Sequence, residues 1–257
     1  MNIQEYDILN AIFTTTNATQ RSLADCSGHS LGIVNRSIKK LTSDGYLTTT
    51  MQPTDRAIAL YKHSVPQNAI ILAAGFGMRM VPINTETPKG LLEIHGEALI
   101  ERIIRQLHEA NIHNIYIVVG FMKEQYEYLI DEYDVTLIVN TDYASKNNLH
   151  SLNLASEYLK NSYIIPCDIW CKDNPFHTHE LYSWYMVSDT QTNESSVRVN
   201  RKMELTAISK TAIGNAMIGI SYLSENDSSY IQQRLSSLDN DARYDGCFWE
   251  ETLYNHN

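Results

Sequence analysis

The feature that most constrains this chain is an apolar run that ends in a glycine-rich turn. Residues 69–74 are Ala-Ile-Ile-Leu-Ala-Ala, and the turn Gly75-Phe-Gly77 follows directly. A short run rich in Ile is typical of a strand that is buried on both faces. Because glycine has no Cβ, such a turn can approach a ligand closely, and its successive backbone N–H groups can hold an anion. The sequence therefore predicts a buried strand that leads into a phosphate-binding turn.

Two cationic residues accompany the turn. Arg79 lies just beyond the second glycine, and Lys89 follows further along the chain. A planar guanidinium suits phosphate oxygens, and a second cation beside it suits a triphosphate. The common phosphate loops do not fit. A Walker loop needs Gly-Lys-Ser/Thr where this chain has Met78 and Arg79, and the dinucleotide fingerprint needs a third glycine where it has Met80.

The remaining pattern resembles the signature of nucleotidyltransferases, which join an NTP to a phosphorylated small molecule. The matching residues are Leu72-Ala-Ala-Gly-x-Gly-x-Arg79, Thr87-Pro-Lys89-x-Leu91, Gly96 and Leu99-Ile-Glu101. The resemblance implies a Rossmann-like nucleotidyltransferase domain that binds an NTP at the turn. The alternative is an ordinary strand–turn–helix whose glycines are only structural.

Beyond this signature, predicted helices and strands alternate along the chain. The apolar patterns predict strands at 114–119, 135–139 and 163–166, separated by helices at 99–107, 122–132 and 147–159. This alternation indicates βαβ units, a mainly parallel mixed sheet and the α/β class. Ligands of such sheets bind beyond the carboxyl ends of the strands. Gly75, Gly120 and Asp168 directly follow predicted strands and are therefore candidate site residues.

The alternation stops past residue 184. A strand is predicted at 217–223 and an amphipathic helix at 229–238. The stretch 197–202, Val-Arg-Val-Asn-Arg-Lys, fits either a solvated strand edge or a clamp for the phosphate of an acceptor.

Two polar residues near the predicted strand ends have both a chemical and a structural interpretation. Asp168 is a candidate Mg²⁺ ligand, because this ion prefers carboxylates and phosphate oxygens. Alternatively, its carboxylate caps the turn that follows the strand. Asn147 has donors and acceptors that suit a base edge or a ribose hydroxyl. Alternatively, it is only the N-cap of the helix that it opens.

Residues 1–62 have the pattern of a separate module. Helical spacing at 3–14 predicts a first helix, Thr19 is a predicted N-cap for a second helix at 20–26, and Ser30 is one for a third that ends near residue 44. The β-prone stretches 46–50 and 58–61 predict a hairpin. This order resembles small bacterial winged helix-turn-helix modules. A linker at 63–67 then leads into a transferase domain at 68–257.

The winged-helix resemblance implies DNA binding by the third helix, with Asn35, Arg36, Lys39 and Lys40 facing a major groove. The net charge of the module gives only weak support to DNA binding. The module has six Lys or Arg residues and five Asp or Glu residues, well short of a strong electrostatic footprint. The alternative is a docking or dimerisation module, and in the second case the protein would be a homodimer.

Four further segments resemble the bacterial CTP:phosphocholine cytidylyltransferases. They are residues 120–129, 147–151, 219–222 and 248–250. The resemblance implies that the chain transfers CMP from CTP to phosphocholine by in-line attack on the α-phosphate. The residues that it places around the nucleotide are Leu72, Ala73, Ala74, Gly75, Gly77, Met78, Arg79, Lys89, Gly120, Asn147 and Ser151. Arg79, Lys89 and Asp168 carry the catalytic charges, and Asp168 and Glu250 bind Mg²⁺. Where this family often has Asp, Glu250 is one methylene longer.

Recognition of choline needs aromatic faces and a carboxylate, because a quaternary ammonium cannot donate hydrogen bonds. Trp249 and Tyr222 are the predicted walls, with Phe248 and Trp184 as further candidates, and Glu250 or Glu251 is the predicted counter-charge. Trp249 is alternatively a core residue. Other acceptors remain open, namely a sugar 1-phosphate, phosphoethanolamine or an aminoalkyl phosphonate. A nucleotide-sensing DNA-binding regulator is the alternative from a different functional class.

Composition places limits on location. No apolar run is long enough to span a membrane, and no signal peptide is recognisable. The four cysteines form no CxxC pair and suit reduced thiols, so a cytoplasmic protein is expected. A net charge of −10 implies that local cations must hold an anionic substrate. Relatives continue with further strand beyond the segment around Trp249, so a shortened C-terminus is an open interpretation.

Overall fold

The computed structural model describes residues 1–77, 86–193, 196–200, 203–207 and 212–254. The chain divides into two compact units. Unit 1 comprises Met1–Val65 together with His179–Tyr182, and unit 2 comprises Pro66–Thr178 and Ser183–Asn257. The division after Val65 falls within the predicted linker, although helix α4 extends to His63. The inclusion of residues 179–182 in unit 1 is not apparent from the sequence pattern.

Unit 1 begins with three helices, α1 (Ile3–Thr14), α2 (Gln20–Ser27) and α3 (Leu31–Ser43). Their starts follow from side-chain caps. Asn2 and Glu5 form a capping box on α1, and the predicted N-caps Thr19 and Ser30 accept backbone N–H groups of α2 and α3. Apolar residues from all three helices share one core cluster. The predicted three-helix order is confirmed.

The predicted hairpin of unit 1 is wrong in its second half. Leu47 and Pro53 form a single antiparallel bridge, and residues 58–61 then lie within helix α4 (Asp55–His63). The Thr54 hydroxyl accepts the N–H of Ala57 and caps this helix. Pro-Thr-Asp is therefore a helix start as well as a turn sequence, and the cap outweighs the β-propensity of the residues that follow.

Residues 179–182 complete the packing of unit 1. The His179 ring stacks on Tyr61 with the ring centres 3.9 Å apart, and Leu181 packs against the core cluster of the unit. The Tyr182 hydroxyl donates to Asp7 at 2.9 Å, and the other carboxylate oxygen of Asp7 lies 2.8 Å from His29. A segment that follows the transferase signature by many residues is therefore part of the fold of the N-terminal unit.

Unit 2 is built on one mixed sheet, and the parallel strands form one half of it. Among the described residues the strand order is β5-β4-β1-β6-β10-β8-β9, with β7 also pairing with β10. The strands β1, β4, β5 and β6 run parallel, whereas the strands beyond β6 pair antiparallel. The bounds are β1 (Asn68–Ala73), β4 (Asn114–Val119), β5 (Thr136–Val139), β6 (Ser162–Pro166), β7 (Trp184–Thr192), β8 (Ser196–Val199), β9 (Leu205–Ala207) and β10 (Gly214–Leu223). The α/β class is confirmed.

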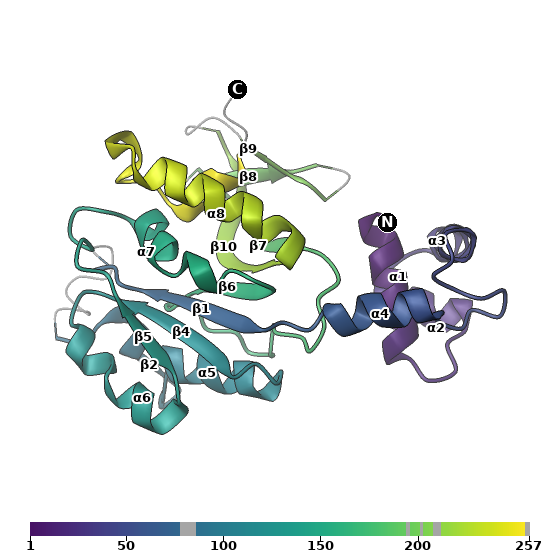
Figure 1. Ribbon diagram of the computed structural model, residues 1–257, viewed down its shortest axis with the longest axis horizontal. Coiled ribbons are helices and arrows are strands. Elements are labelled where there is room, and N and C mark those ends of the chain that lie inside the picture. The colour runs from purple at the N-terminus through teal and green to yellow at the C-terminus, as the bar shows by residue number, and fades with distance from the viewer. Residues whose placement is uncertain (78–85, 194–195, 201–202, 208–211, 255–257) are drawn as a thin grey trace. The chain divides into compact units, whose positions relative to one another are not determined.

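Helices cover both faces of this sheet (Figure 1), because alternate residues of β1 point to opposite sides. Ala69, Ile71 and Ala73 share a cluster with α5 and α6, whereas Ile70 and Leu72 share one with α7 and α8. The helices are α5 (Leu99–Glu109), α6 (Tyr128–Tyr133), α7 (Asn148–Leu154) and α8 (Glu225–Asp239). A small hairpin, β2 (Glu93–Ile94) and β3 (Glu97–Ala98), precedes α5.

Two predicted helices are shorter than the sequence pattern indicates. The stretch 122–132 starts with Met122 in the left-handed region and continues as the 3₁₀ turn η3 (Lys123–Tyr126) before α6. This turn buries Tyr126 completely. The stretch 147–159 divides into α7 and the turn η4 (Ser156–Tyr158). In the first stretch, burial of Tyr126 therefore outweighs the continuous helical periodicity. No helix among the described residues has the length and apolar character needed to cross a membrane.

Candidate active site

A cavity of about 1070 Å³ opens at the carboxyl ends of the parallel strands. The residues that follow neighbouring strands line it in strand order. Tyr143 follows β5, Phe121 follows β4, the turn 74–77 follows β1, and Asp168 follows β6. The cavity therefore lies where the strand-end argument predicts a ligand site.

A charged pair, Lys89 and Asp168, lies on the β6 side of this cavity. Lys89 Nζ is 3.0 Å from the Asp168 carboxylate, and the two side chains expose 18% and 32% of their surface. Lys89 opens the 3₁₀ turn η2 (Lys89–Leu91), and Gly90 fits this turn tightly against Tyr126 and Cys167. A Cβ at position 90 would lie 3.0 Å from the Tyr126 hydroxyl and 3.1 Å from the Cys167 Cβ. Tight packing of η2 thus brings the two charged groups together.

Cys167 lies next to Asp168 but is not a candidate nucleophile. Its side chain is completely buried. Burial raises the pKa of the Cys167 thiol to about 12, so the thiolate that would be needed for nucleophilic attack is scarce at neutral pH. The Lys89–Asp168 pair is therefore the candidate reactive group at this strand end.

Asn147 and Ser151 both line the cavity, and both are already engaged in hydrogen bonds. The Asn147 Oδ1 accepts the N–H of Asn148 at 2.7 Å, and the Asn147 amide donates to the Gly246 carbonyl at 3.1 Å. The buried Ser151 hydroxyl accepts from the Asn140 amide at 3.0 Å. The alternative of Asn147 as a helix N-cap is confirmed, and its predicted contact with the nucleotide stays a prediction.

The C-terminal segment 245–248 forms a wall of the cavity, and residues of the α7 start hold it in place. The backbone N–H of Asn147 donates to the Asp245 carbonyl at 2.7 Å. Asn148 Oδ1 accepts the backbone N–H of Trp249 at 2.8 Å. Phe248 lines the cavity and exposes 43% of its surface. Of the aromatic walls predicted for choline, Phe248 is thus the one that the described lining includes.

Tyr222 and Trp249 require correction as substrate walls. Tyr222 is 0% exposed and Trp249 is 1% exposed, and each belongs to an apolar core cluster. Tyr222 lies inside β10, and its ring contacts that of Tyr163 at 5.3 Å. Trp249 begins the 3₁₀ turn η6 (Trp249–Leu253). Tyr222 is buried by its position within the strand, and Trp249 by its packing in the cluster that includes α7 and α8. Neither ring is therefore in the described lining of the cavity.

Glu250, the predicted second Mg²⁺ ligand, is not in the described lining of the cavity. Its Oε1 accepts the Tyr185 hydroxyl at 2.8 Å, and its Oε2 is buried without a hydrogen-bond partner among the described residues. Burial raises the pKa of the Glu250 carboxyl to about 7. Asp168 and Asp245 are the carboxylates in the described lining. Glu250 therefore does not join Asp168 at the cavity in this structure.

The other predicted nucleotide residues divide into three groups. Leu72, Ala74, Gly75 and Gly77 line the cavity, and Gly77 adopts a left-handed φ of 70°. Ala73 is 1% exposed and packs in the core. Gly120 packs against Tyr143, which lines the cavity. A Cβ at Gly120 would lie 2.7 Å from the Tyr143 Cβ. Met78 and Arg79 lie outside the described residues.

Several lining residues were not predicted from the sequence. They are Phe76, Phe121, Tyr143, Ala144, Ser145, Lys146, Asn148, Pro166, Asp245 and Gly246. Phe76 and Phe121 could have been found, because each is next to a residue singled out by the strand-end rule. Asp245 and Gly246 are distant in sequence from the other lining residues, and tertiary contacts, including hydrogen bonds to Asn147, bring them here.

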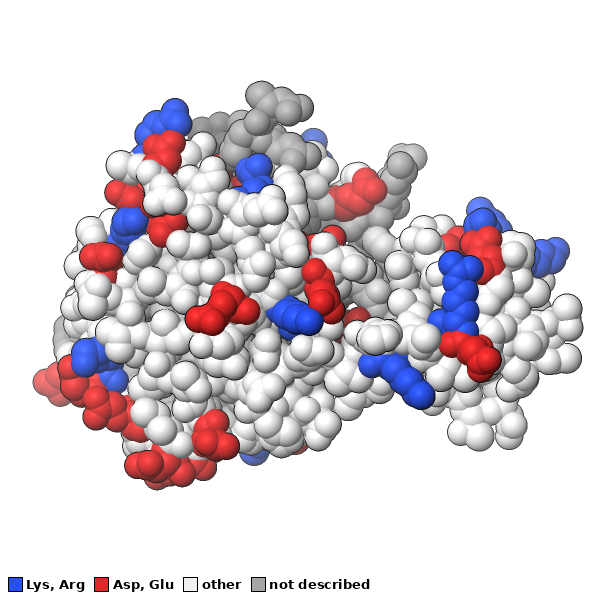
Figure 2. All heavy atoms as spheres, viewed as in Figure 1, with Lys and Arg blue, Asp and Glu red and all other residues white. Residues whose placement is uncertain are grey.

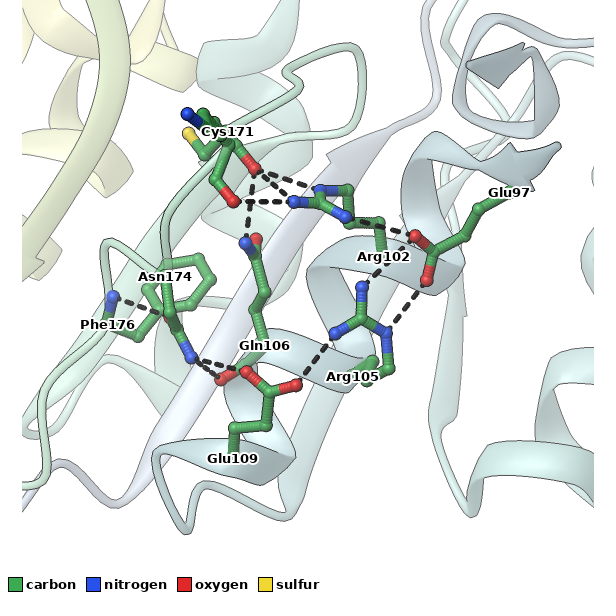
Figure 3. Close-up of polar contacts among 9 residues, drawn as sticks. Glu97, Arg102, Arg105, Gln106, Glu109, Cys171, Asn174 and Phe176 are labelled. Atoms are coloured by element: carbon green, nitrogen blue, oxygen red, sulfur yellow. Dashed lines mark hydrogen bonds and ion pairs between the residues drawn. The ribbon is translucent and has the colours of Figure 1, made fainter. Parts of the chain in front are cut away.

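A polar network holds the segment that follows Asp168 (Figure 3). Arg102 of α5 donates to the carbonyl oxygens of Cys171 and Lys172, with its closest contact at 2.7 Å to Cys171. Gln106 donates to the same Cys171 carbonyl at 3.2 Å. Arg102 also pairs with Glu97, which Arg105 shares. The network therefore fixes the chain three residues beyond the candidate metal ligand.

Comparison with known proteins agrees with this architecture. Residues 69–192 match the family model of the MobA-like NTP transferase domain, and residues 1–48 match that of winged helix-turn-helix DNA-binding. The choline-phosphate cytidylyltransferase of Haemophilus influenzae is 36% identical over 68% of this chain and 77% of that enzyme. The 2-aminoethylphosphonate cytidylyltransferase of Lancefieldella rimae is 32% identical over 74% of this chain and 80% of its own length.

A solved structure shares the fold of unit 2. The CTP:phosphocholine cytidylyltransferase of Streptococcus pneumoniae superposes with a TM-score of 0.67 at 31% sequence identity. The match covers 74% of this chain and 84% of that structure. All three of these enzymes are named as cytidylyltransferases, two of them for phosphocholine and one for 2-aminoethylphosphonate.

Proposed function

Because this chain belongs to the nucleotidyltransferases with a MobA-like NTP transferase domain, we propose that it transfers CMP from CTP to phosphocholine and releases pyrophosphate. The observation that carries the proposal is the Lys89–Asp168 pair beside the glycine turn, in a cavity at the strand ends. The choice of acceptor rests on the relatives that are named as choline-phosphate cytidylyltransferases. A 2-aminoethylphosphonate acceptor is the nearest rival, because a relative of similar coverage is named for it.

The reaction needs positioning and charge more than proton transfer. An oxygen of the acceptor phosphate attacks the α-phosphorus of CTP, and the bond from that phosphorus to the bridging oxygen of the β-phosphate breaks. The nucleophile is already anionic, so no general base is required. The turn 75–77 binds the triphosphate, and Lys89 donates to the departing pyrophosphate. Its ammonium has three donors, so it can hold Asp168 and a phosphate oxygen together.

A divalent ion fits one side of this site. The Asp168 carboxylate lines the cavity, and Mg²⁺ is commonly bound by one or two carboxylates together with substrate phosphates. Among the described residues, no group of three or more His, Cys, Asp or Glu side chains could hold a metal. Asp168 would therefore hold an ion that arrives with the nucleotide. When bound, such an ion neutralises negative charge that develops on the phosphates.

The direct test is a matrix of nucleotides against acceptors in the presence of Mg²⁺. Pyrophosphate release is measured with CTP, UTP and GTP against phosphocholine, phosphoethanolamine, 2-aminoethylphosphonate and glucose 1-phosphate. The proposal predicts the highest kcat/KM for CTP with phosphocholine. If kcat/KM for CTP is higher with 2-aminoethylphosphonate than with phosphocholine, the proposed acceptor is wrong but the proposed cytidylyl transfer stands. No pyrophosphate release with any pair would contradict the proposed function.

A second function, duplex DNA binding by unit 1, is favoured by one observation. The family model of winged helix-turn-helix DNA-binding covers α1 to α3, and α3 exposes Arg36, Lys39 and Lys40. On the face shown in Figure 2, however, basic side chains of unit 1 lie beside acidic ones. We propose weak binding through phosphate contacts. Replacing Arg36 and Lys39 by Ala should reduce the salt slope of duplex affinity by about two, whereas Lys62→Ala on α4 should leave the slope unchanged.

A further inference from the structure

Three aromatic rings occupy successive strand ends on one side of the glycine turn. Phe76 follows β1, Phe121 follows β4 and Tyr143 follows β5, and all three half-buried rings line the cavity. The Phe76 and Phe121 rings meet edge to face with their centres 4.4 Å apart. The Phe121 and Tyr143 ring centres are 6.4 Å apart. The rings thus form a continuous aromatic flank across three neighbouring strands.

The backbone fixes this flank. The Phe121 N–H donates to the Ala74 carbonyl at 3.0 Å, which ties the end of β4 to the end of β1. Gly120 allows Tyr143 to approach, because a Cβ there would lie 2.7 Å from the Tyr143 Cβ and 2.9 Å from the Ala74 carbonyl oxygen. The rings are therefore held in place before a ligand binds, which lowers the entropic cost of stacking on them.

The charges of the strand ends lie on the other side of the turn. Asp168 follows β6 and holds Lys89 at 3.0 Å, so the order along the sheet edge is aromatic, aromatic, glycine turn with Phe76, then charged pair. Neighbouring strands are about 4.8 Å apart, so the flank extends roughly 10 Å from the turn. This reach suits a nucleoside that extends from a triphosphate held at the turn.

We propose that Phe76, Phe121 and Tyr143 form a platform on which the base of the substrate nucleotide stacks. This inference rests on the proposed function and adds to it the residues that position the base. It also assigns the two sides of the cavity: the base lies over β4 and β5, and the acceptor phosphate approaches from the side of β6. Because every base has a π-face, stacking holds the base without identifying it.

The test uses Phe121→Leu in the full chain, with Mg²⁺ present and binding measured by calorimetry. Leucine keeps an apolar side chain of similar size but removes the ring face. The affinities for CTP and for UTP should both fall about tenfold. The affinity for inorganic tripolyphosphate, which has the charges but no base, should not change. Phe121→Tyr should restore CTP affinity to within about twofold of the wild type, and Tyr230→Leu, an exposed ring on α8, is the matched control.

Two results would overturn the platform. One is unchanged CTP affinity in Phe121→Leu, accompanied by weaker phosphocholine binding, which would place the rings around the acceptor. The other is equal loss of CTP and tripolyphosphate affinity, which would mean that the ring acts by supporting the phosphate turn. Failure of the proposed function has a different signature, because the wild type would then bind CTP but transfer nothing to any acceptor. A wild type that binds no CTP would overturn both.

Discussion

Aromatic residues at the strand ends in the parallel half of the unit 2 sheet line the cavity, whereas Tyr222, an aromatic residue within a strand of the antiparallel half, lies in the core. In the parallel half, Phe121 and Tyr143 lie just beyond strand ends and line the cavity. In the antiparallel part, Tyr222 lies within a strand and is fully buried. Trp249, from the C-terminal turn, is buried in the cluster that includes α7 and α8. An aromatic residue therefore becomes a candidate ligand contact through its position relative to a strand end, and ring chemistry alone does not distinguish the two roles.

The largest effect expected from this comparison is on folding. Trp249→Ala should lower the free energy of unfolding by about 3–5 kcal/mol, because it removes a fully buried ring. Phe248→Ala, the neighbouring aromatic that lines the cavity, should lower it much less and instead change KM for a substrate. Chemical denaturation and steady-state kinetics compare the two variants. A stable Trp249→Ala protein with a raised KM for phosphocholine would restore Trp249 as a substrate wall.

The next effect concerns the charged strand end. Lys89→Ala should reduce kcat by about 10²–10³-fold, the usual consequence of removing one donor to developing charge. Its effect on stability should be small, because the pair with Asp168 is partly exposed. Lys123→Ala is the matched control, since that lysine pairs with its neighbour Glu124 on η3. Full kcat for Lys89→Ala at saturating CTP would remove Lys89 from the mechanism.

The close approach at the end of β4 provides a steric test. Gly120→Ala should force Tyr143 and the Ala74 carbonyl apart, at a cost of about 1–3 kcal/mol in stability. CTP affinity should fall as well, because both displaced residues line the cavity. Gly246→Ala is the control, since a Cβ there meets nothing within 4 Å. Equal thermal stability of the two variants would show that the end of β4 is not tightly packed.

Burial of Glu250 predicts a pH dependence of stability. The folded carboxyl has a pKa of about 7, above its ordinary value, so the folded state holds this proton more strongly than the unfolded state. The free energy of unfolding should therefore fall as pH rises from about 4.5 to 7, by about 2–3 kcal/mol from this group. Glu250→Gln should flatten that slope and be the more stable protein at pH 8. An unchanged slope in the variant would mean that Glu250 is solvated.

The smallest effect is expected for the network on α5. Arg102→Ala should remove the arginine hydrogen bonds to the carbonyls of Cys171 and Lys172 and lower kcat about threefold to tenfold, because the backbone beyond Asp168 is less constrained. The Mg²⁺ concentration for half-maximal rate should rise. Arg105 also pairs with Glu97 but does not contact these carbonyls. The rate and Mg²⁺ dependence of Arg105→Ala should therefore match those of the wild type. Identical Mg²⁺ curves for the two variants would separate Arg102 from the site.

The sequence predicted those parts of the molecule that depend on short-range pattern. Apolar periodicity located β1, β4 and β6, and the strand-end rule led to Gly75 and Asp168. The sequence did not reveal which distant segments meet. Asp245 reaches the cavity through hydrogen bonds to Asn147, and residues 179–182 join unit 1. Burial of Tyr222 likewise depends on tertiary packing, which cannot be predicted from the spacing of apolar residues or from residue type.

The central claim is that the glycine turn and Lys89 hold a triphosphate while Asp168 lies on the side from which the acceptor approaches. A crystal structure with a non-hydrolysable CTP analogue and Mg²⁺ tests it most directly. We predict phosphate density beside Gly75 and Gly77 within hydrogen-bonding distance of Lys89, with the metal on Asp168. Phosphates bound outside this cavity, or a metal held by Glu250 without Asp168, would contradict the account.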